Sequence, residues 1–163
     1  MDTEPKDIIV LGAIQAGIKK FDKIQKMTQI EPEELNSILE QLEKSVFIRV
    51  VEKNGLLGNK IEIMVTGKGS KEVDKQVHDL QTKWNLMSTL YKTQDKEGLK
   101  QYMDDNKSFF PMMIFFGVMN IEMFSMMFGM IDMKMSNYVP TENMPEGEDS
   151  SRNEGEFYED VGS

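Results

Sequence analysis

The spacing of apolar residues changes after Val46, and this change limits the folds that the chain can adopt. Before that point apolar residues recur every three or four positions, as in a helix with one buried face. These residues are Leu35, Ile38, Leu39, Leu42 and Val46. Afterwards apolar and other residues alternate over 46–51 and again over 60–65, which is the period of a strand. We therefore predict a helix followed by a β-hairpin.

The hairpin turn is predicted at Asn54-Gly55, because these residues favour tight turns. Leu56-Leu57-Gly58 would lengthen the tip beyond two residues. Upstream, residues 7–17 predict a short buried helix that ends at Gly17. Asp22 is a good N-cap for a brief second helix that carries Ile24 and Met27, and residues 28–30 make the next turn.

The third helix is predicted to open at Glu31-Pro32-Glu33-Glu34. Proline is tolerated in the first turn of a helix, and acidic residues there interact favourably with the positive end of the helix dipole. Three short helices and a hairpin, in this order, are typical of a winged helix. The sequence therefore predicts a mainly α fold with a small β-hairpin, in which long C-terminal helices follow a winged helix-turn-helix domain over residues 1–69.

Two phrases resemble the third helix and wing of winged-helix regulators of the MarR and PadR families. They are EPEELNSILEQLEKSVFIRVVE and KIEIMVTGKG, and the run Val65-Thr66-Gly67-Lys68-Gly69 is similar to the Leu-Thr-x-x-Gly phrase that closes the wing in those families. The resemblance covers about residues 6–70. It implies a DNA-binding transcriptional regulator that acts as a homodimer.

The third helix is acidic where such regulators contact bases. Its exposed face would carry Asn36, Ser37 and Gln41 among five glutamates, and these carboxylates would meet the negative charge of a duplex. Direct base readout is therefore disfavoured. The same acidity suits a protein-binding winged helix, and we keep this alternative open.

Basic residues occur at the two places where winged helices contact DNA phosphates. One group surrounds the second helix and the other lies on or beside the wing. They are Lys19, Lys20, Lys23 and Lys26, and Arg49, Lys53, Lys60 and Lys68. We expect contacts with the phosphate backbone and little sequence specificity, although an ordinary solvated surface would also carry such residues.

Residues 70–94 predict one amphipathic helix with a heptad pattern. Apolar residues recur at alternating spacings of four and three. They are Val73, Val77, Leu80, Trp84, Met87 and Tyr91. We interpret this face as a homodimer interface, and packing on the chain's own domain is the alternative. His78 is expected to be a solvated residue.

Residues 95–139 predict a helical, methionine-rich segment. From Phe109 to Ile131 the chain is apolar, glycine or proline except at Asn120, Glu122 and Ser125, and a run of this length could span a bilayer. Glu122 near its centre and sparse flanking lysine and arginine argue against a span. Burial in a core is one interpretation. The others are a deformable surface for an apolar ligand, peptide or protein, and a weak Cu(I) site. The surface would consist of Met119, Met123, Met126, Met127 and Met130.

The charge of the chain is concentrated in its last segment. Residues 140–163 hold eight acidic residues and one arginine, and the whole chain has a net charge of −9. Such a composition predicts a disordered acidic tail, in which Phe157-Tyr158 could be a short docking motif.

Cysteine is absent and His78 is the only histidine, so thiolate chemistry and the usual metal centres are disfavoured. No catalytic group, cofactor site or phosphate-binding glycine loop is visible. No secretory signal is visible either, and we expect a cytoplasmic location. These observations favour a non-enzymatic DNA-binding protein. The alternative is an adaptor or chaperone-like module that binds through the acidic third helix and the methionine-rich segment.

Overall fold

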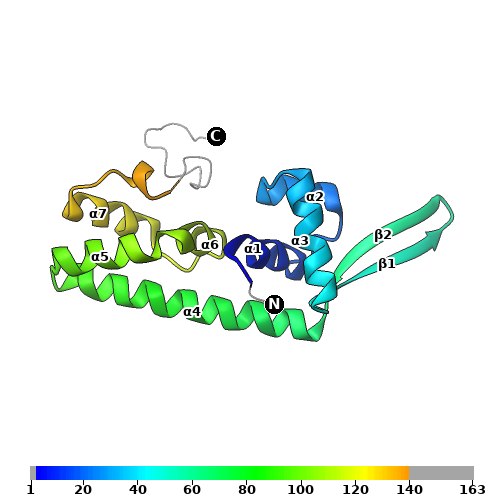
Figure 1. Cartoon of the computed structure of the whole chain (residues 1–163), viewed down its shortest axis with the longest axis horizontal. Coiled ribbons are helices and arrows are strands. Elements are labelled where there is room, and N and C mark those ends of the chain that lie inside the picture. The colour runs from blue at the N-terminus through cyan, green and yellow to red at the C-terminus, as the bar shows by residue number, and fades with distance from the viewer. Residues whose placement is uncertain (1–2, 140–163) are drawn as a thin grey trace, which may run out of the picture. The chain divides into compact units, whose positions relative to one another are not determined.

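The computed structural model describes residues 3–139, and the chain divides into two units, Met1–Thr82 and Lys83–Ser163. The first unit contains α1 (Pro5–Gln15), α2 (Phe21–Thr28), α3 (Pro32–Lys44), β1 (Ile48–Gly55) and β2 (Gly58–Val65) (Figure 1). The long helix α4 (Gly67–Lys92) begins in the first unit and ends in the second. The expected order of three helices, a hairpin and further helices is confirmed. The predicted acidic tail, 140–163, lies outside the described residues.

Helix α1 begins two residues before the predicted start. Pro5 occupies its first position, and the Glu4 amide donates to Oδ2 of Asp7 at 2.8 Å. These two features are a proline-compatible first turn and half of a capping box. The helix ends at Gln15, and Gly17 follows with a φ of 106°, which glycine adopts without a steric penalty. Gly17 therefore follows the helix, as expected, but is not part of it.

Helix α2 begins at Phe21 with Lys20 as its N-cap, so the predicted cap at Asp22 is wrong. Asp22 lies in the first turn, where its negative charge still interacts favourably with the positive end of the helix dipole. Helix α3 begins at Pro32 as predicted. Its apolar face is core, because Leu35, Ile38, Leu39 and Leu42 are buried.

Val46 was predicted to belong to the buried face of α3, and this prediction is wrong. Its side chain is 56% exposed and its φ is +62°. The Phe47 amide donates to the Leu42 carbonyl and the Val46 amide to the Glu43 carbonyl, both at 2.9 Å. These two bonds form a Schellman motif, which places its penultimate residue in the left-handed region. Phe47, the next residue, is buried instead.

The hairpin has a two-residue tip, so the predicted longer tip is also wrong. Strand pairing runs from Ile48 opposite Val65 to Gly55 opposite Gly58, and it leaves only Leu56 and Leu57 in the turn. Gly58 has a φ of +115°, which permits this reversal. The first strand begins at Ile48 instead of Val46.

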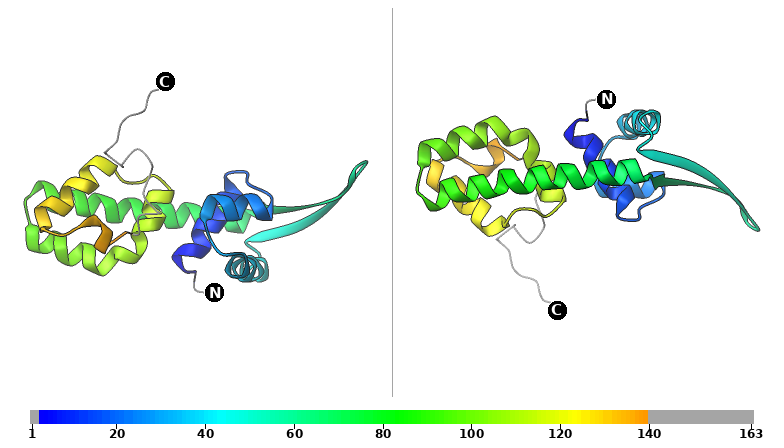
Figure 2. Two further views of the ribbon diagram at one scale, coloured as in Figure 1. Left: turned by 90° about the horizontal axis from the view of Figure 1, so that it is seen from above. Right: turned by 90° about the horizontal axis from the view of Figure 1, so that it is seen from below.

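Only the base of the hairpin contributes to the core. Ile48 and Ile63 are buried, whereas Val50 is 46% and Ile61 is 62% exposed. In Figures 1 and 2 the two strands extend away from α1, α2 and α3. The alternation of apolar residues is therefore present, but beyond the base of the hairpin no element within residues 3–139 covers its apolar face.

Thr66 and Gly69 join the hairpin to α4. The Thr66 hydroxyl lies 2.6 Å from the Val46 carbonyl oxygen and accepts a hydrogen bond from the Gly69 amide at 3.0 Å. A Cβ atom at Gly69 would lie 2.2 Å from the carbonyl oxygen of Phe47. The threonine thus caps the helix, and the glycine allows its first turn to approach the backbone before β1.

The second unit breaks the methionine-rich run into separate helices. They are α5 (Lys96–Asn106), η1 (Lys107–Phe109), α6 (Phe110–Phe115), α7 (Ile121–Ile131) and η2 (Met135–Asn137). The segment 95–139 is helical as predicted, but it consists of several short helices. Gly117 reverses the chain with a φ of +67°, and the Asn120 side chain caps α7 by accepting from the Met123 amide at 2.8 Å. Within residues 3–139, no helix has both the length and the apolar character needed to cross a bilayer.

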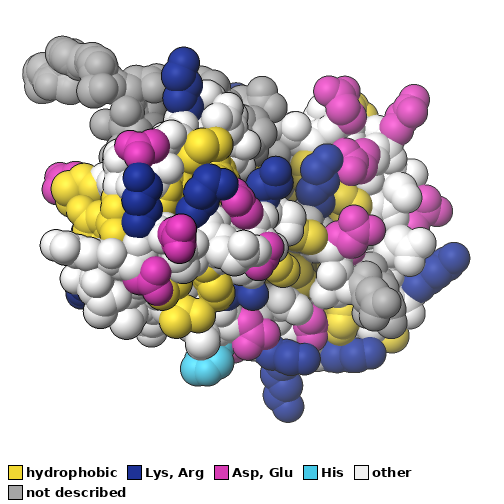
Figure 3. Space-filling model, turned by 60° about the vertical axis from the view of Figure 1, so that its left-hand side comes forward, with side chains coloured by type: hydrophobic (Ala, Val, Ile, Leu, Met, Phe, Trp, Pro, Cys, Tyr) yellow, Lys and Arg dark blue, Asp and Glu magenta, His cyan; other side chains and the backbone are white. Residues whose placement is uncertain are grey.

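Aromatic rings form the centre of the second unit. The ring of Phe124 meets those of Phe110, Phe128 and Trp84 edge-on, with centroids 5.2, 4.9 and 6.5 Å away. Such edge-to-face pairs add to the stabilisation from apolar burial. On the face seen in Figure 3, hydrophobic side chains show as separate patches among charged side chains of both signs.

Candidate nucleic-acid interface

Three lysines of the first unit act on one carboxylate of the hairpin. We call Lys19, Lys53 and Lys60 the hairpin lysine cluster. Lys53 Nζ lies 3.1 Å from Oε1 of Glu62, whose side chain is 19% exposed. The ion pair with Lys53 lowers the pKa of Glu62, and the charges of Lys19 and Lys60 lower this pKa further, whereas desolvation opposes the change. Positive charge is thus concentrated around this single acid.

Backbone pairing holds this cluster in place. The register sets Lys53 directly opposite Lys60, and Glu62 opposite Val51. Side chains of paired residues lie on one face of a hairpin, and every second pair shares that face. Arg49, opposite Met64, therefore lies on the same face as Lys53, Lys60 and Glu62. The Ile63 amide donates to the Lys19 carbonyl at 2.9 Å, and this bond fixes the segment before α2 against β2.

The remaining predicted lysines divide into two groups. Lys20, Lys23 and Lys26 are exposed at the start of α2 and along it. Lys68 is exposed too, but its ammonium donates to the Ser45 carbonyl at 3.0 Å and lies 5.2 Å from the centre of the Phe47 ring. Lys68 therefore stabilises the end of α3, a role that the sequence did not indicate.

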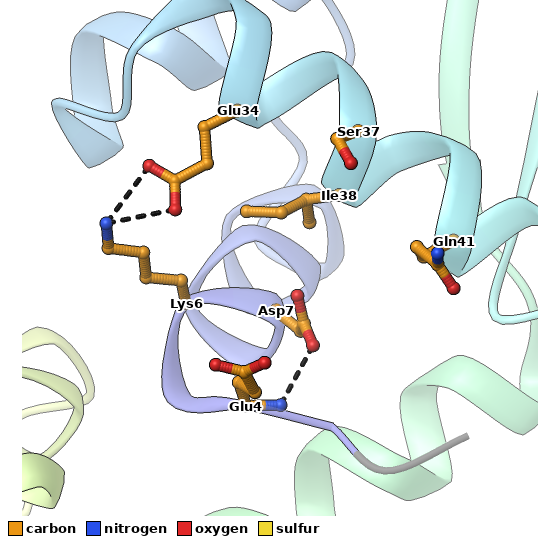
Figure 4. A pocket seen from close by; sticks show the side chains of 7 residues that line it. All are labelled: Glu4, Lys6, Asp7, Glu34, Ser37, Ile38 and Gln41. Atoms are coloured by element: carbon orange, nitrogen blue, oxygen red, sulfur yellow. Dashed lines mark hydrogen bonds and ion pairs between the residues drawn. The ribbon is translucent and has the colours of Figure 1, made fainter.

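The predicted contact residues of α3 are exposed, and two of them line a cleft. Ser37 and Gln41 lie beside the start of α1, where Glu4 and Asp7 approach α3 (Figure 4). Asn36 donates to Glu40 at 3.5 Å. Three carboxylates and one lysine line the cleft, and Lys6 pairs with Glu34 at 3.0 Å. Its acidic lining does not suit a nucleic acid.

The heptad face of α4 is largely covered within a single chain. Val73, Leu80, Trp84 and Met87 are buried, whereas Val77 and Tyr91 are half-buried. Packing on the chain's own elements accounts for this burial. Dimerisation through this face stays a prediction, and it would require these side chains to be uncovered first.

The methionines predicted to form one apolar surface point in different directions. Met119 and Met127 are buried, Met123 and Met130 are half-buried, and Met126 is 51% exposed. Met126 and Met130 line a shallow depression with Tyr91, Lys92 and Gln94. The methionine thioethers considered as Cu(I) ligands are therefore also divided between buried and exposed positions. Among the described residues, no three His, Asp or Glu side chains are grouped as metal ligands.

The sequence placed Leu56 and Leu57 in the hairpin tip without indicating a role for them, and it did not indicate the role of Glu62. Leu56 and Leu57 are fully exposed. Two leucines between glycines, in a turn that normally favours polar residues, were the available signal. Glu62 could not be recognised, because its position among lysines depends on the strand register. Comparison of the chain with family models, curated proteins and solved structures finds no match.

Proposed function

We propose that this chain is a non-enzymatic DNA-binding protein of the winged-helix kind, which holds the phosphate backbone with little sequence choice. One observation carries the proposal: the strand register and the backbone bond from Ile63 to Lys19 bring Lys19, Lys53 and Lys60 around Glu62, from the hairpin and from the segment before α2. Lysine ammonium groups on such a projecting element suit phosphate contacts. Lys20, Lys23 and Lys26 extend the positive charge along α2.

The composition of α3 defines what kind of binding to expect. Glu33, Glu40 and Glu43 are exposed along this helix, and carboxylates repel phosphates. Affinity would come from the lysines of α2 and the hairpin, so it should fall steeply as salt is raised and vary little with sequence. In this proposal the protein is a regulator or organiser of DNA that does not read bases through α3.

A salt-titrated gel shift with a random duplex tests the proposal. The charge-reversed variant K20E/K23E/K60E should bind every duplex more weakly, on the order of 100-fold, and its salt slope should fall by about three. The matched control is K71E/K75E/K92E, which makes the same change of charge at exposed positions of α4. The control should stay within about threefold of the wild type. Failure of the wild type to bind at low salt would remove the proposal.

The substitution Glu62→Gln is expected to change DNA affinity in the opposite direction. Because its pKa is lowered, Glu62 is ionised at neutral pH and offsets part of the cluster's charge. Its removal frees Lys53 for a phosphate, so affinity should rise several-fold and the salt slope should steepen by about one. Weaker binding by Glu62→Gln would contradict the assigned interface. Glu52→Gln, on the other face of the hairpin, is the control.

A protein-binding role is the second candidate, and the exposed carboxylates of α3 favour it. An acidic helix face fits a basic segment of a partner better than it fits a duplex. Purification of the full chain from native cells distinguishes the two candidates. Recovery of a stoichiometric polypeptide, lost on substitution of Glu33 and Glu40 by lysine, would support the adaptor. Recovery of nuclease-sensitive nucleic acid would support the DNA-binding protein.

A further inference from the structure

The hairpin tip presents two large apolar side chains outside the fold. Leu56 is 106% and Leu57 is 99% exposed, and they occupy the two turn positions between the paired glycines Gly55 and Gly58. Asparagine, aspartate or glycine is normally favoured in such a turn. Leucine gains no burial there on folding, so the structure of the chain alone gives no reason for this pair.

Polar and positive groups lie directly behind the tip. Asn54 pairs with Asn59, and the next pair along is Lys53 with Lys60. Like charges set opposite each other destabilise a hairpin, and Lys53 has a counter-charge in Glu62, at 3.1 Å. Among residues 3–139, Lys60 forms no ion pair within 4.0 Å. Each strand therefore carries one lysine toward the apolar end.

We propose that Leu56 and Leu57 form an apolar wedge, which enters the minor groove of bound DNA and partly unstacks one base step. Leucine is one of the side chains that proteins insert in this way, and insertion kinks the duplex and widens the groove. Lys53 and Lys60, one on each strand, reach the two phosphate ridges that border the groove. Asn54 lies beside the tip on the other face of the arm, and its amide can donate to the acceptors on the groove floor. This inference rests on the proposed DNA-binding function and adds a deformation of the duplex to it.

The distribution of charge favours DNA over an anionic bilayer. Positive groups occur behind the tip, at Arg49 near the base of β1, and at Lys19. The strands span about 26 Å at ~3.3 Å per residue, and a duplex can be contacted at both ends of such an arm. A flat bilayer approached tip first would leave the basic residues at the base without a role.

The test uses the full chain and an A·T-rich duplex with 2-aminopurine at a central TA step, a step that unstacks easily. Binding, 2-aminopurine fluorescence and end-to-end energy transfer are measured together. The wild type should raise the fluorescence severalfold and shorten the end-to-end distance. The variant L56N/L57G keeps a favoured hairpin turn. It should lose the fluorescence rise and the bend, and its affinity should fall about tenfold, through lost apolar contact at the step.

Ile61→Thr is the matched control, because it removes an exposed apolar side chain from the side of the arm instead of its tip. It should unstack the step as the wild type does. Bound wild type without a fluorescence change, or L56N/L57G with an unchanged rise, would overturn the wedge and leave the proposed function standing. Absence of binding at low salt would overturn both. Leucine-dependent binding to phosphatidylserine vesicles, without unstacking of DNA, would identify the tip as a bilayer anchor and overturn the wedge.

Discussion

The hairpin and the methionine-rich segment differ in how far their apolar side chains are exposed. Val50, Leu56, Leu57 and Ile61 of the hairpin are exposed. In the segment that begins at Phe109, the large side chains of Phe110, Met113, Phe124 and Met127 are fully buried. The hairpin has the more ordinary composition and yet the more exposed apolar surface.

This difference shows where to look for a partner. A long apolar run in a sequence suggests a binding surface, but such a run can also fold on itself and form a core. Apolar residues of the hairpin beyond its base are not buried in this way, because no other element of the described part of the chain covers them. Their exposure in the folded chain therefore indicates interaction more directly than the apolar character of the sequence does.

Among the substitutions that test this difference, Phe124→Ala is expected to have the largest effect on the free energy of unfolding. The ring is fully buried among Phe110, Phe128 and Trp84, so its loss should lower the free energy of unfolding by about 3–5 kcal/mol. Urea denaturation followed by circular dichroism measures the change. Met126→Ala in the same helix and Ile61→Ala in the hairpin, both exposed, should each change it by less than about 0.5 kcal/mol. Equal effects of Phe124→Ala and Met126→Ala would break the comparison.

Gly69→Ala tests how the exposed hairpin is held at its base. An added Cβ would meet the Phe47 carbonyl oxygen at 2.2 Å, and a backbone atom there cannot move away freely. We expect a loss of about 1–3 kcal/mol in the free energy of unfolding, although alanine favours helix. Gly67→Ala, where no atom lies within 4 Å, is the control and should be neutral or slightly stabilising. Thermal unfolding of both variants decides the matter, and an equally stable Gly69→Ala would show that this close approach does not constrain the junction.

The smallest effect is expected at the polar contact between Tyr138 and Asp104. Burial and the hydrogen bond to Asp104 raise the pKa of Tyr138 to about 12, and the same bond lowers the pKa of Asp104. The folded pKa of the phenol lies above the ~10 of an unfolded chain. Its contribution to stability is therefore complete below pH ~10 and is lost as the pH rises toward 12.

Tyr138→Phe should lower the free energy of unfolding by about 1 kcal/mol at pH 7, because the carboxylate partner is partly solvated. It should also flatten the decline of stability above pH 10, which urea denaturation at pH 7, 9 and 11 measures. Tyr91→Phe serves as the control. A variant with the same pH dependence as the wild type would remove Tyr138 as the source of that decline.

Local signals in the sequence predicted α3 and the hairpin well. Pro32 after Glu31 marks the start of α3, and the change of period after Val46 marks the strands, because both depend on neighbouring residues only. The position of Val46 itself was missed, since the Schellman motif that exposes it depends on how Phe47 packs. The two-residue tip was missed because Asn54-Gly55 is also a good turn sequence, and only the register of the strands selects Leu56-Leu57.

The sequence by itself determined the order of three helices, a hairpin and further helices, and which residues carry charge. Propensity, capping and periodicity act over a few residues, so these features can be read without a fold. Only the tertiary structure decided that the methionine-rich run is broken into short helices around buried aromatic rings, that three lysines surround Glu62, and that the two leucines of the hairpin tip stay fully exposed. Burial and electrostatic grouping depend on distances between residues far apart in the chain, and those distances are set when the chain packs.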